Sequence, residues 1–173
     1  MSLTKYIFLF IAIPFLLSGK LFAQIQSVQI GVNGLTCSQC SRSVEMSIRK
    51  LDFVKEVRMN LANTEGEIFF NEGYKADVNK IAKAVVDAGF SVRYLKATIY
   101  FKQVPVTENY CWINEGKYYQ FIKTNTKVID GITTVTFINK QFMPKAEYKK
   151  WSTTIKESQG KGCEAKQIFY ITL

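Results

Sequence analysis

Residues 28–51 read VQIGVNGLTCSQCSRSVEMSIRKL, and the spacing of the apolar residues changes halfway along this stretch. The first part predicts a half-buried strand, because every second residue is apolar: Val28, Ile30 and Val32. From about Ser38 to Leu51 the spacing predicts an amphipathic helix, with one apolar face made by Val44, Ile48 and Leu51. The stretch therefore predicts a strand that passes through a short loop into a helix.

The pattern outward from this stretch completes a small fold. A strand is predicted over 57–61, a turn over 63–66 and a partner strand over 67–70. Asp77 is placed as the N-cap of a second helix, Gly89 ends that helix, and Phe90 begins a last strand. The order β-α-β-β-α-β is that of a ferredoxin-like α+β sandwich, in which two helices cover one face of a four-stranded antiparallel sheet. We expect residues 24–96 to form this domain.

Residues 97–173 predict a second small α+β module with a mostly antiparallel sheet. A hairpin is indicated by the turn at 114–117 between two aromatic-rich segments, and Asp130-Gly131 suggests another turn. Pro144 suits the first position of a helix that ends near Gly160, and 167–173 is a last strand. Residues 94–104 continue to alternate as a strand, so no flexible linker is expected between the two modules. No motif gives the role of this second module.

Composition excludes several kinds of chemistry. The chain contains no histidine, which removes Ser-His and Cys-His catalysis, histidine-ligated zinc and blue-copper sites. The net charge is +9, and the positive excess lies in the second half, where eleven lysines face six acids across 97–173. The lysines are spread over strands and loops, so a solvated basic face is favoured and nucleic acid is not expected as a partner.

The N-terminus predicts export. Lys5 precedes an apolar segment over 6–17 of signal-peptide length, and Ala23 stands at the expected cleavage position, so residues 1–23 are predicted to be a signal peptide. An uncleaved anchor is the alternative, but a membrane span needs about 20 apolar residues. The mature protein is therefore expected outside the cytoplasm, in the periplasm, without a transmembrane span.

The segment Gly34-Leu35-Thr36-Cys37-Ser38-Gln39-Cys40 places two cysteines three residues apart where the first strand passes into the first helix. Both sulfurs can point at one ion, and thiolates select soft ions such as Cu(I) or Hg(II). The positive end of the helix dipole stabilises the thiolate form of both side chains. Cys37 and Cys40 are the candidate metal ligands.

This motif, together with the element order, resembles the heavy-metal-associated domains of copper chaperones, of copper-transporting P-type ATPases and of the periplasmic mercury carrier. The resemblance covers about residues 26–96. It implies near-linear Cu(I) binding by Cys37 and Cys40, with Cys37 as the loop ligand that a partner reaches first and with transfer to a protein such as a transporter. It also places Phe90 beside the site and makes Leu35, where the family usually has methionine, an inward-packing residue.

Three alternatives remain open from the sequence. The metal could be Hg(II), as in a mercury carrier of the same fold. The motif could instead be a redox dithiol or a simple disulfide, because export favours oxidation. Cys111 and Cys163 are expected to form a structural disulfide, with a second soft-metal site as the other interpretation. The leading hypothesis is an exported Cu(I) chaperone or scavenger, not an enzyme.

Overall fold

The computed structural model describes residues 25–125 and 127–173, so the predicted signal peptide lies outside the described part. The first half contains β1 (Ile25–Asn33), α1 (Ser38–Arg49), β2 (Val54–Asn60), β3 (Glu65–Phe70), α2 (Val78–Asp87) and β4 (Ser91–Val106). The second half contains β5 (Cys111–Asn114), β6 (Lys117–Phe121), β7 (Lys127–Phe137), the 3-10 helix η3 (Lys140–Phe142), α3 (Lys145–Ser158) and β8 (Ile168–Thr172).

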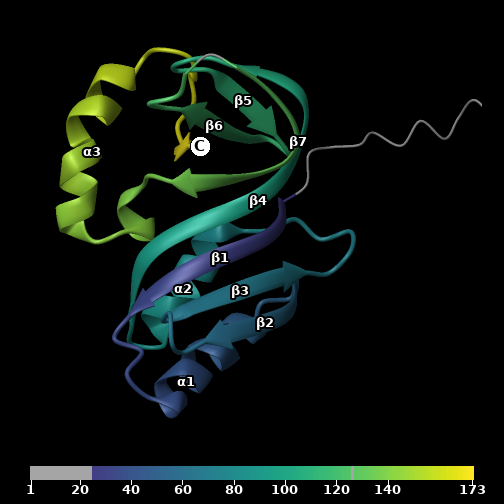
Figure 1. The fold of residues 1–173 in the computed structure, drawn as a ribbon, viewed down its shortest axis with the longest axis vertical. Coiled ribbons are helices and arrows are strands. Elements are labelled where there is room, and N and C mark those ends of the chain that lie inside the picture. Colours follow the sequence, from purple (N-terminus) through teal and green to yellow (C-terminus); the bar gives the residue numbers. More distant parts are fainter. Residues whose placement is uncertain (1–24, 126) are drawn as a thin grey trace, which may run out of the picture.

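The first six elements confirm the predicted ferredoxin-like order. Their strands lie in the order β2-β3-β1-β4, and every neighbouring pair is antiparallel. Helices α1 and α2 contact each other and pack on the sheet, α1 against β2 and α2 against β4 (Figure 1). The alternation of β1 buries Val28, Ile30 and Val32 completely. The apolar face of α1 meets this layer through Val44 and Ile48.

The ends of α2 form as the sequence predicts. The Asp77 carboxylate accepts hydrogen bonds from the backbone N–H groups of Asn79, at 3.0 Å, and Lys80, at 3.3 Å. These bonds satisfy two of the donors that a helix start leaves unpaired. At the other end Gly89 takes a φ of +88°, which glycine adopts without strain, and the chain turns into β4.

Strand β4 joins the two halves of the molecule. It is 16 residues long, pairs with β1 from Ser91 to Ile99, and pairs with β7 from Lys96 to Val106. The result is one eight-stranded sheet in the order β2-β3-β1-β4-β7-β8-β6-β5. The boundary expected after residue 96 lies inside this strand, which confirms that no flexible linker separates the halves.

The second half is a mostly antiparallel α+β arrangement, as predicted. Strands β5 and β6 form the expected hairpin, with Glu115 and Gly116 at positive φ in its turn. Helix α3 begins directly after Pro144, and Gly160 follows its end at a φ of +73°. Strand β8 lies between β7 and β6, and its pairing with β6 is parallel.

The prediction of a turn at Asp130-Gly131 is wrong. Strand β7 runs through both residues, and Gly131 pairs with Phe101 of β4 at a φ of +88°. The pairing of the two strands shifts just beyond this point, and the Asp130 carboxylate accepts a hydrogen bond from the Gln103 N–H at 3.2 Å. Two residues of β4, Lys102 and Gln103, lie here opposite the single residue Asp130, which is the arrangement of a β-bulge. Aspartate and glycine also favour turns, so the sequence alone predicted one.

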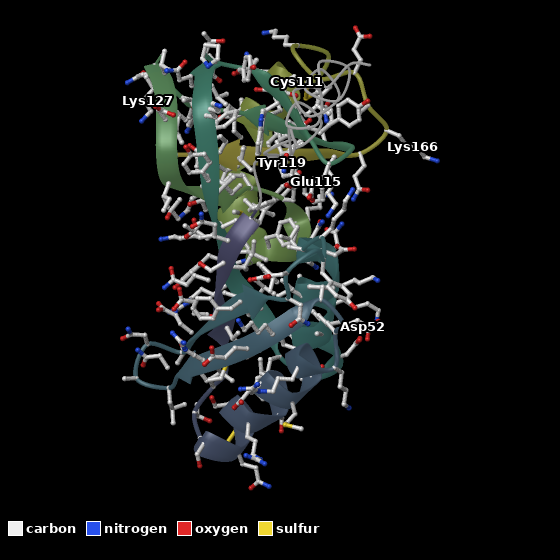
Figure 2. The ribbon with its side chains drawn as sticks, turned by 90° about the vertical axis from the view of Figure 1, so that its right-hand side faces the viewer. Asp52, Cys111, Glu115, Tyr119, Lys127 and Lys166 are labelled. Carbon is white, nitrogen blue, oxygen red and sulfur yellow. A yellow bond between two sulfur atoms is a disulfide. The ribbon has the colours of Figure 1, made fainter. Side chains whose placement is uncertain are left out.

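One hydrophobic cluster extends through both halves. It includes Ile30 and Leu95 in the first half and Phe101, Tyr119 and Phe137 towards the second, all less than 3% exposed. Aromatic rings fill the second half, and those of Phe101 and Trp112 have centroids 4.8 Å apart. Burial raises the pKa of the Tyr119 hydroxyl above its usual range, and Figure 2 places this residue in the upper half of the molecule.

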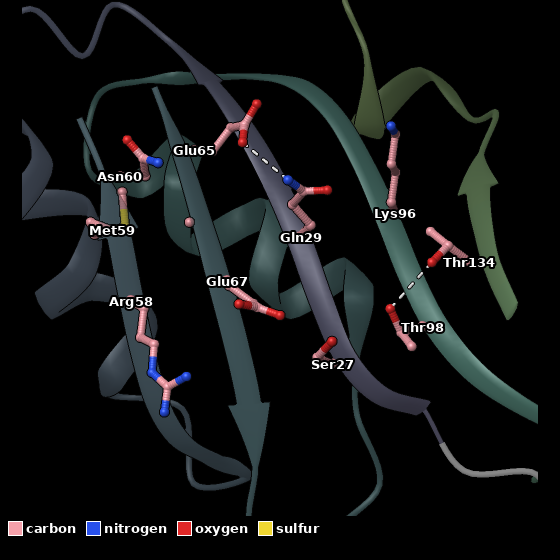
Figure 3. Close-up of a pocket in the computed structure, with 11 residues that line it drawn as sticks. Ser27, Gln29, Arg58, Met59, Asn60, Glu65, Glu67, Lys96, Thr98 and Thr134 are labelled. Carbon is pink, nitrogen blue, oxygen red and sulfur yellow. Dashed lines mark hydrogen bonds between the residues drawn. The ribbon is translucent and has the colours of Figure 1, made fainter. Parts of the chain in front are cut away.

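The face of the sheet opposite α1 and α2 is polar. A hollow of about 330 Å³ lies on it, lined by residues from β1 to β4 and β7. Several of its polar groups already pair with one another, since Gln29 donates to Glu65 at 3.0 Å and the hydroxyls of Thr98 and Thr134 lie 3.4 Å apart (Figure 3). This face is a solvated surface.

A single core predicts that the two halves unfold together. Ile30→Ala removes a fully buried side chain of the first half and should lower the free energy of unfolding by about 2–5 kcal/mol. Both tryptophans, Trp112 and Trp151, lie in the second half, so their fluorescence in a urea titration reports on that half. We expect the midpoint of the tryptophan transition to move to lower urea, by the shift that the whole loss of unfolding free energy produces.

The exposed substitution Val128→Ala, at a side chain that is 66% exposed, serves as the control and should leave the midpoint unchanged. A tryptophan transition that does not move in Ile30→Ala, while far-ultraviolet circular dichroism shows an earlier loss of structure, would mean that the halves unfold independently.

Candidate metal centre

A tight loop delivers the motif from β1 to α1. Gly34 takes a φ of +89°, and the Thr36 N–H donates to the Gly34 carbonyl at 2.9 Å, which turns the chain sharply after Asn33. Leu35 points into the core and is 3% exposed, as the resemblance implies for this position. The loop is thus fixed by one buried side chain, and the residues that follow it are left at the surface.

Cys37 is the N-cap of α1. Its backbone is extended, with φ −144° and ψ 158°, and its Sγ accepts a hydrogen bond from the Cys40 N–H at 3.1 Å. The Cys37 carbonyl accepts a hydrogen bond from the Ser41 N–H at 3.1 Å, and this bond closes the first turn of the helix. A sulfur here takes the place that a serine or aspartate oxygen usually occupies, and it lies where unpaired N–H groups favour negative charge.

The two motif cysteines differ in exposure. Cys37 is exposed, whereas Cys40, in the first turn of α1, is half-buried and packs against the core. Their Cα atoms are 5.3 Å apart, and the structure joins the two sulfurs as a disulfide. The oxidised form was left open by the sequence, and its closure shows that both sulfurs reach a common point.

Phe90 lies beside the loop, as the resemblance implies. A Cβ placed on Gly34 would come within 3.6 Å of the Phe90 ring, and the ring itself packs against the core. The methionines are used elsewhere: Met59 packs against Gly66 on the sheet, and Met46 is 45% exposed on α1. The immediate surroundings of the pair are therefore apolar on one side and open to solvent on the other.

Within residues 25–125 and 127–173, no three or more cysteine, aspartate or glutamate side chains come together as a possible metal site. The first turn of α1 contains no acidic residue. A closed zinc site needs about four protein ligands. The pair can instead offer two thiolates, a donor set that suits a soft ion.

The second cysteine pair lies in the other half of the molecule. Cys111 and Cys163 are joined as a disulfide across a sequence separation of 52 residues, as expected from the sequence. Figure 2 places Cys111 in the upper half, while Figure 1 places α1 and its motif at the lower end. Cys163 is 3% exposed, and its Sγ contacts the carbonyl of Tyr119 at 3.7 Å. This disulfide fastens the segment between α3 and β8 to the β5–β6 hairpin.

The N-cap role of Cys37 was not predicted. The signal was present in the sequence, because a side-chain acceptor three residues before Cys40 is the N-cap spacing. Cysteine is not among the usual capping residues, and only the backbone geometry reveals that its sulfur accepts this hydrogen bond.

A family model described as the heavy-metal-associated domain matches residues 29–91. The mercuric transport protein periplasmic component of Pseudomonas fluorescens is 36% identical over 69 residues, which are 40% of this chain and 75% of that protein. The chain belongs to the heavy-metal-associated domain family. Copper-transporting ATPase 1 of Rhizobium meliloti is 39% identical over 70 residues, but this match covers only 8% of that protein.

A solved structure of oxidised MerP from Ralstonia metallidurans CH34 is 35% identical to this chain, with a TM-score of 0.35, covering 39% of this chain and 94% of the other. The family model ends at residue 91, at the start of β4, and the Pseudomonas and Rhizobium proteins each match 40% of the chain.

The different exposure of the two disulfides predicts the order in which they open. A short pulse of a phosphine reductant followed by iodoacetamide should label Cys37 and Cys40 first, because Cys37 is exposed and Cys163 is buried. Peptide mass mapping at increasing pulse times measures this order. Earlier labelling of Cys111 and Cys163, or any peptide that links the motif to the second pair, would contradict it.

Proposed function

We propose that this protein is an exported carrier of a soft metal ion, most simply Cu(I), which is held as cargo by Cys37 and Cys40. One observation supports this above the others. Two sulfurs converge at the exposed start of α1, with no third cysteine or carboxylate gathered around them in the described residues. Two thiolates without further protein ligands suit an ion that must be bound and then released.

The position of the pair favours cargo over a structural metal. The core of the domain is filled by β1, β3, β4, α1 and α2, and a disulfide already fastens the second half. The cysteines lie at the edge of this core, so the fold does not depend on an ion there. Zinc domains that need their metal to fold use closed four-ligand sites.

The exposure of Cys37 gives a direction for transfer. A thiolate of a partner protein can approach the ion from the solvent side, where Cys37 lies, while Cys40 remains half-buried against the core. The ion would first be shared between Cys37, Cys40 and the incoming thiolate, and the partner would then displace Cys37. The family resemblance implies the same order.

The place of action is proposed from the N-terminal sequence. Residues 1–23 have the composition of a signal peptide, and two disulfides suit an oxidising compartment. One matched relative is named a periplasmic component of mercuric transport. None of the helices formed by residues 25–125 and 127–173 has the length and apolar character to cross a bilayer. The partner would be a metal-transfer protein such as a transporter.

Two further candidates rest on specific observations. Hg(II) is the alternative cargo, since the mercuric transport relative is matched over most of its length. A dithiol–disulfide redox role is favoured by the disulfide between Cys37 and Cys40 at a helix start. Competition between metal ions for the protein tests the Hg(II) alternative. A disulfide-reduction assay tests the redox role.

Replacing both motif cysteines tests the assignment. Cys37→Ser/Cys40→Ser should abolish stoichiometric Cu(I) binding, measured anaerobically by competition with a chromophoric chelator. The fold should persist, because serine is itself a favourable N-cap and can accept the hydrogen bond that the Cys37 sulfur accepts. Retained competition for Cu(I) by the double variant would contradict the proposal.

The matched control is Cys111→Ser/Cys163→Ser, which also removes two cysteines. It should bind one Cu(I) per chain but lose about 2–4 kcal/mol of stability, because the structural disulfide is gone. Catalytic reduction of insulin disulfides by the wild-type protein, at a rate that Cu(I) does not suppress, would favour the redox role instead.

A further inference from the structure

A groove of about 510 Å³ lies between the two halves of the molecule, at a place that neither half forms alone. One wall is α2 with the start of β4, and the other is η3 with the start of α3. Apolar side chains form much of its surface: Ala82, Val86, Val92, Met143 and Pro144. Val86 is 58% exposed, although it lies on a helix whose other apolar side chains are mostly buried.

All the charged residues that line this groove are lysines. Lys83, Lys140 and Lys145 line it, and no aspartate or glutamate does. A neighbouring hollow of about 390 Å³ shares Lys140 and Lys145 and adds Lys149, again without an acid. Lys83 pairs with Asp87 at 2.6 Å, but the other three lysines form no ion pair with any described residue. Three unneutralised ammonium groups beside an apolar floor attract an anionic, partly apolar ligand.

One residue pair connects the groove with the start of the loop that carries the motif. Ser91 lines the groove, and its Oγ accepts a hydrogen bond from the Asn33 amide at 3.4 Å. Asn33 pairs with Ser91 across β1 and β4, and the next residue, Gly34, begins the loop that leads to Cys37. A partner that binds in the groove can therefore extend from it along this loop towards the motif.

The two walls are held in a fixed relation. The Gln141 amide joins the walls by donating to the Asn79 side-chain oxygen at 2.8 Å, and outside the groove the Lys117 ammonium joins the two halves by donating to the Ala76 carbonyl at 2.7 Å. Strand β4 runs through both halves behind these contacts. The groove is preorganised, so a ligand binds without first ordering it.

We infer that this groove is the docking surface for an acidic amphipathic helix of the protein that exchanges metal with Cys37 and Cys40, an inference that rests on the proposed function. Apolar side chains of that helix contact Val86, Val92 and Met143, and its carboxylates pair with Lys140, Lys145 and Lys149. A protein segment is favoured over a lipid surface because the apolar floor is recessed between two walls. The second half of the chain thus supplies one wall of the partner site.

A synthetic helix tests the surface directly. The probe is a peptide of about 18 residues with leucine at helical spacing on one face and glutamate elsewhere, and its counterpart has lysine in place of each glutamate. Binding is followed by fluorescence anisotropy at low and at physiological salt. We expect the acidic peptide to bind and the basic peptide not to bind. Methyl resonances of Ala82, Val86, Val92 and Met143 should shift on addition of the acidic peptide.

Two charge-reversal variants of equal net charge separate a specific surface from general attraction. Lys140→Glu/Lys145→Glu should weaken binding at least about tenfold, whereas Lys102→Glu/Lys127→Glu, at exposed lysines outside both hollows, should have little effect. Equal weakening by both variants, shifts confined to other residues, or no binding of the acidic peptide would overturn the inference. So would binding of anionic phosphatidylglycerol vesicles that Lys140→Glu/Lys145→Glu abolishes while the peptide fails to bind.

Cu(I) titration of the same variants keeps this inference separate from the proposed function. Lys140→Glu/Lys145→Glu should still bind one Cu(I), because its substitutions do not touch the motif. If wild-type protein bound the acidic peptide but not Cu(I), the surface would stand and the metal function would fail. If it bound Cu(I) but not the peptide, the metal function would stand and the docking surface would fail.

Discussion

The pairing of β4 with a strand on each side is the interaction on which the rest of the structure depends. The pairing with β1 completes the ferredoxin-like sheet between Ser91 and Ile99. Here β4 continues to Val106, and its later residues pair with β7. The backbone hydrogen bonds of this one strand turn two small modules into a single sheet with a shared core. Modules of about 75 residues have little core of their own, so the shared strand stabilises both.

The motif is placed where this stable frame ends. Leu35 and Cys40 pack inward, while Cys37 remains at the surface as the first group of α1. The Cys37 sulfur, a proposed metal ligand, also accepts the Cys40 N–H. The same residue therefore caps α1 and belongs to the candidate site. The loop can therefore be exposed for exchange and still be held in one conformation.

The first half could be predicted from the sequence because its local signals agree with its fold. Alternation in β1, the carboxylate N-cap at Asp77 and the glycine stop at Gly89 each specify one geometry. The second half was predicted less completely. Asp130-Gly131 has the residue types of both a turn and a bulge, and only its pairing with β4 decides between them. The groove brings Val86 and Met143 together from segments far apart in the chain, which no local pattern records.

The central position of β8 has a consequence for the time at which the fold forms. This strand follows β5, β6 and β7 in the sequence, yet it separates β7 from β6 in the sheet, and the β5–β6 hairpin joins the other strands through β8. During synthesis the chain emerges from its N-terminus, so residues 25–99 can assemble early through contacts that are already available. The hairpin must wait until residues 168–172 arrive, because it has no other strand to pair with. Until then its apolar strands and the thiol of Cys111 stay exposed, so the interval before residues 168–172 emerge leaves the chain open to aggregation and to wrong disulfides.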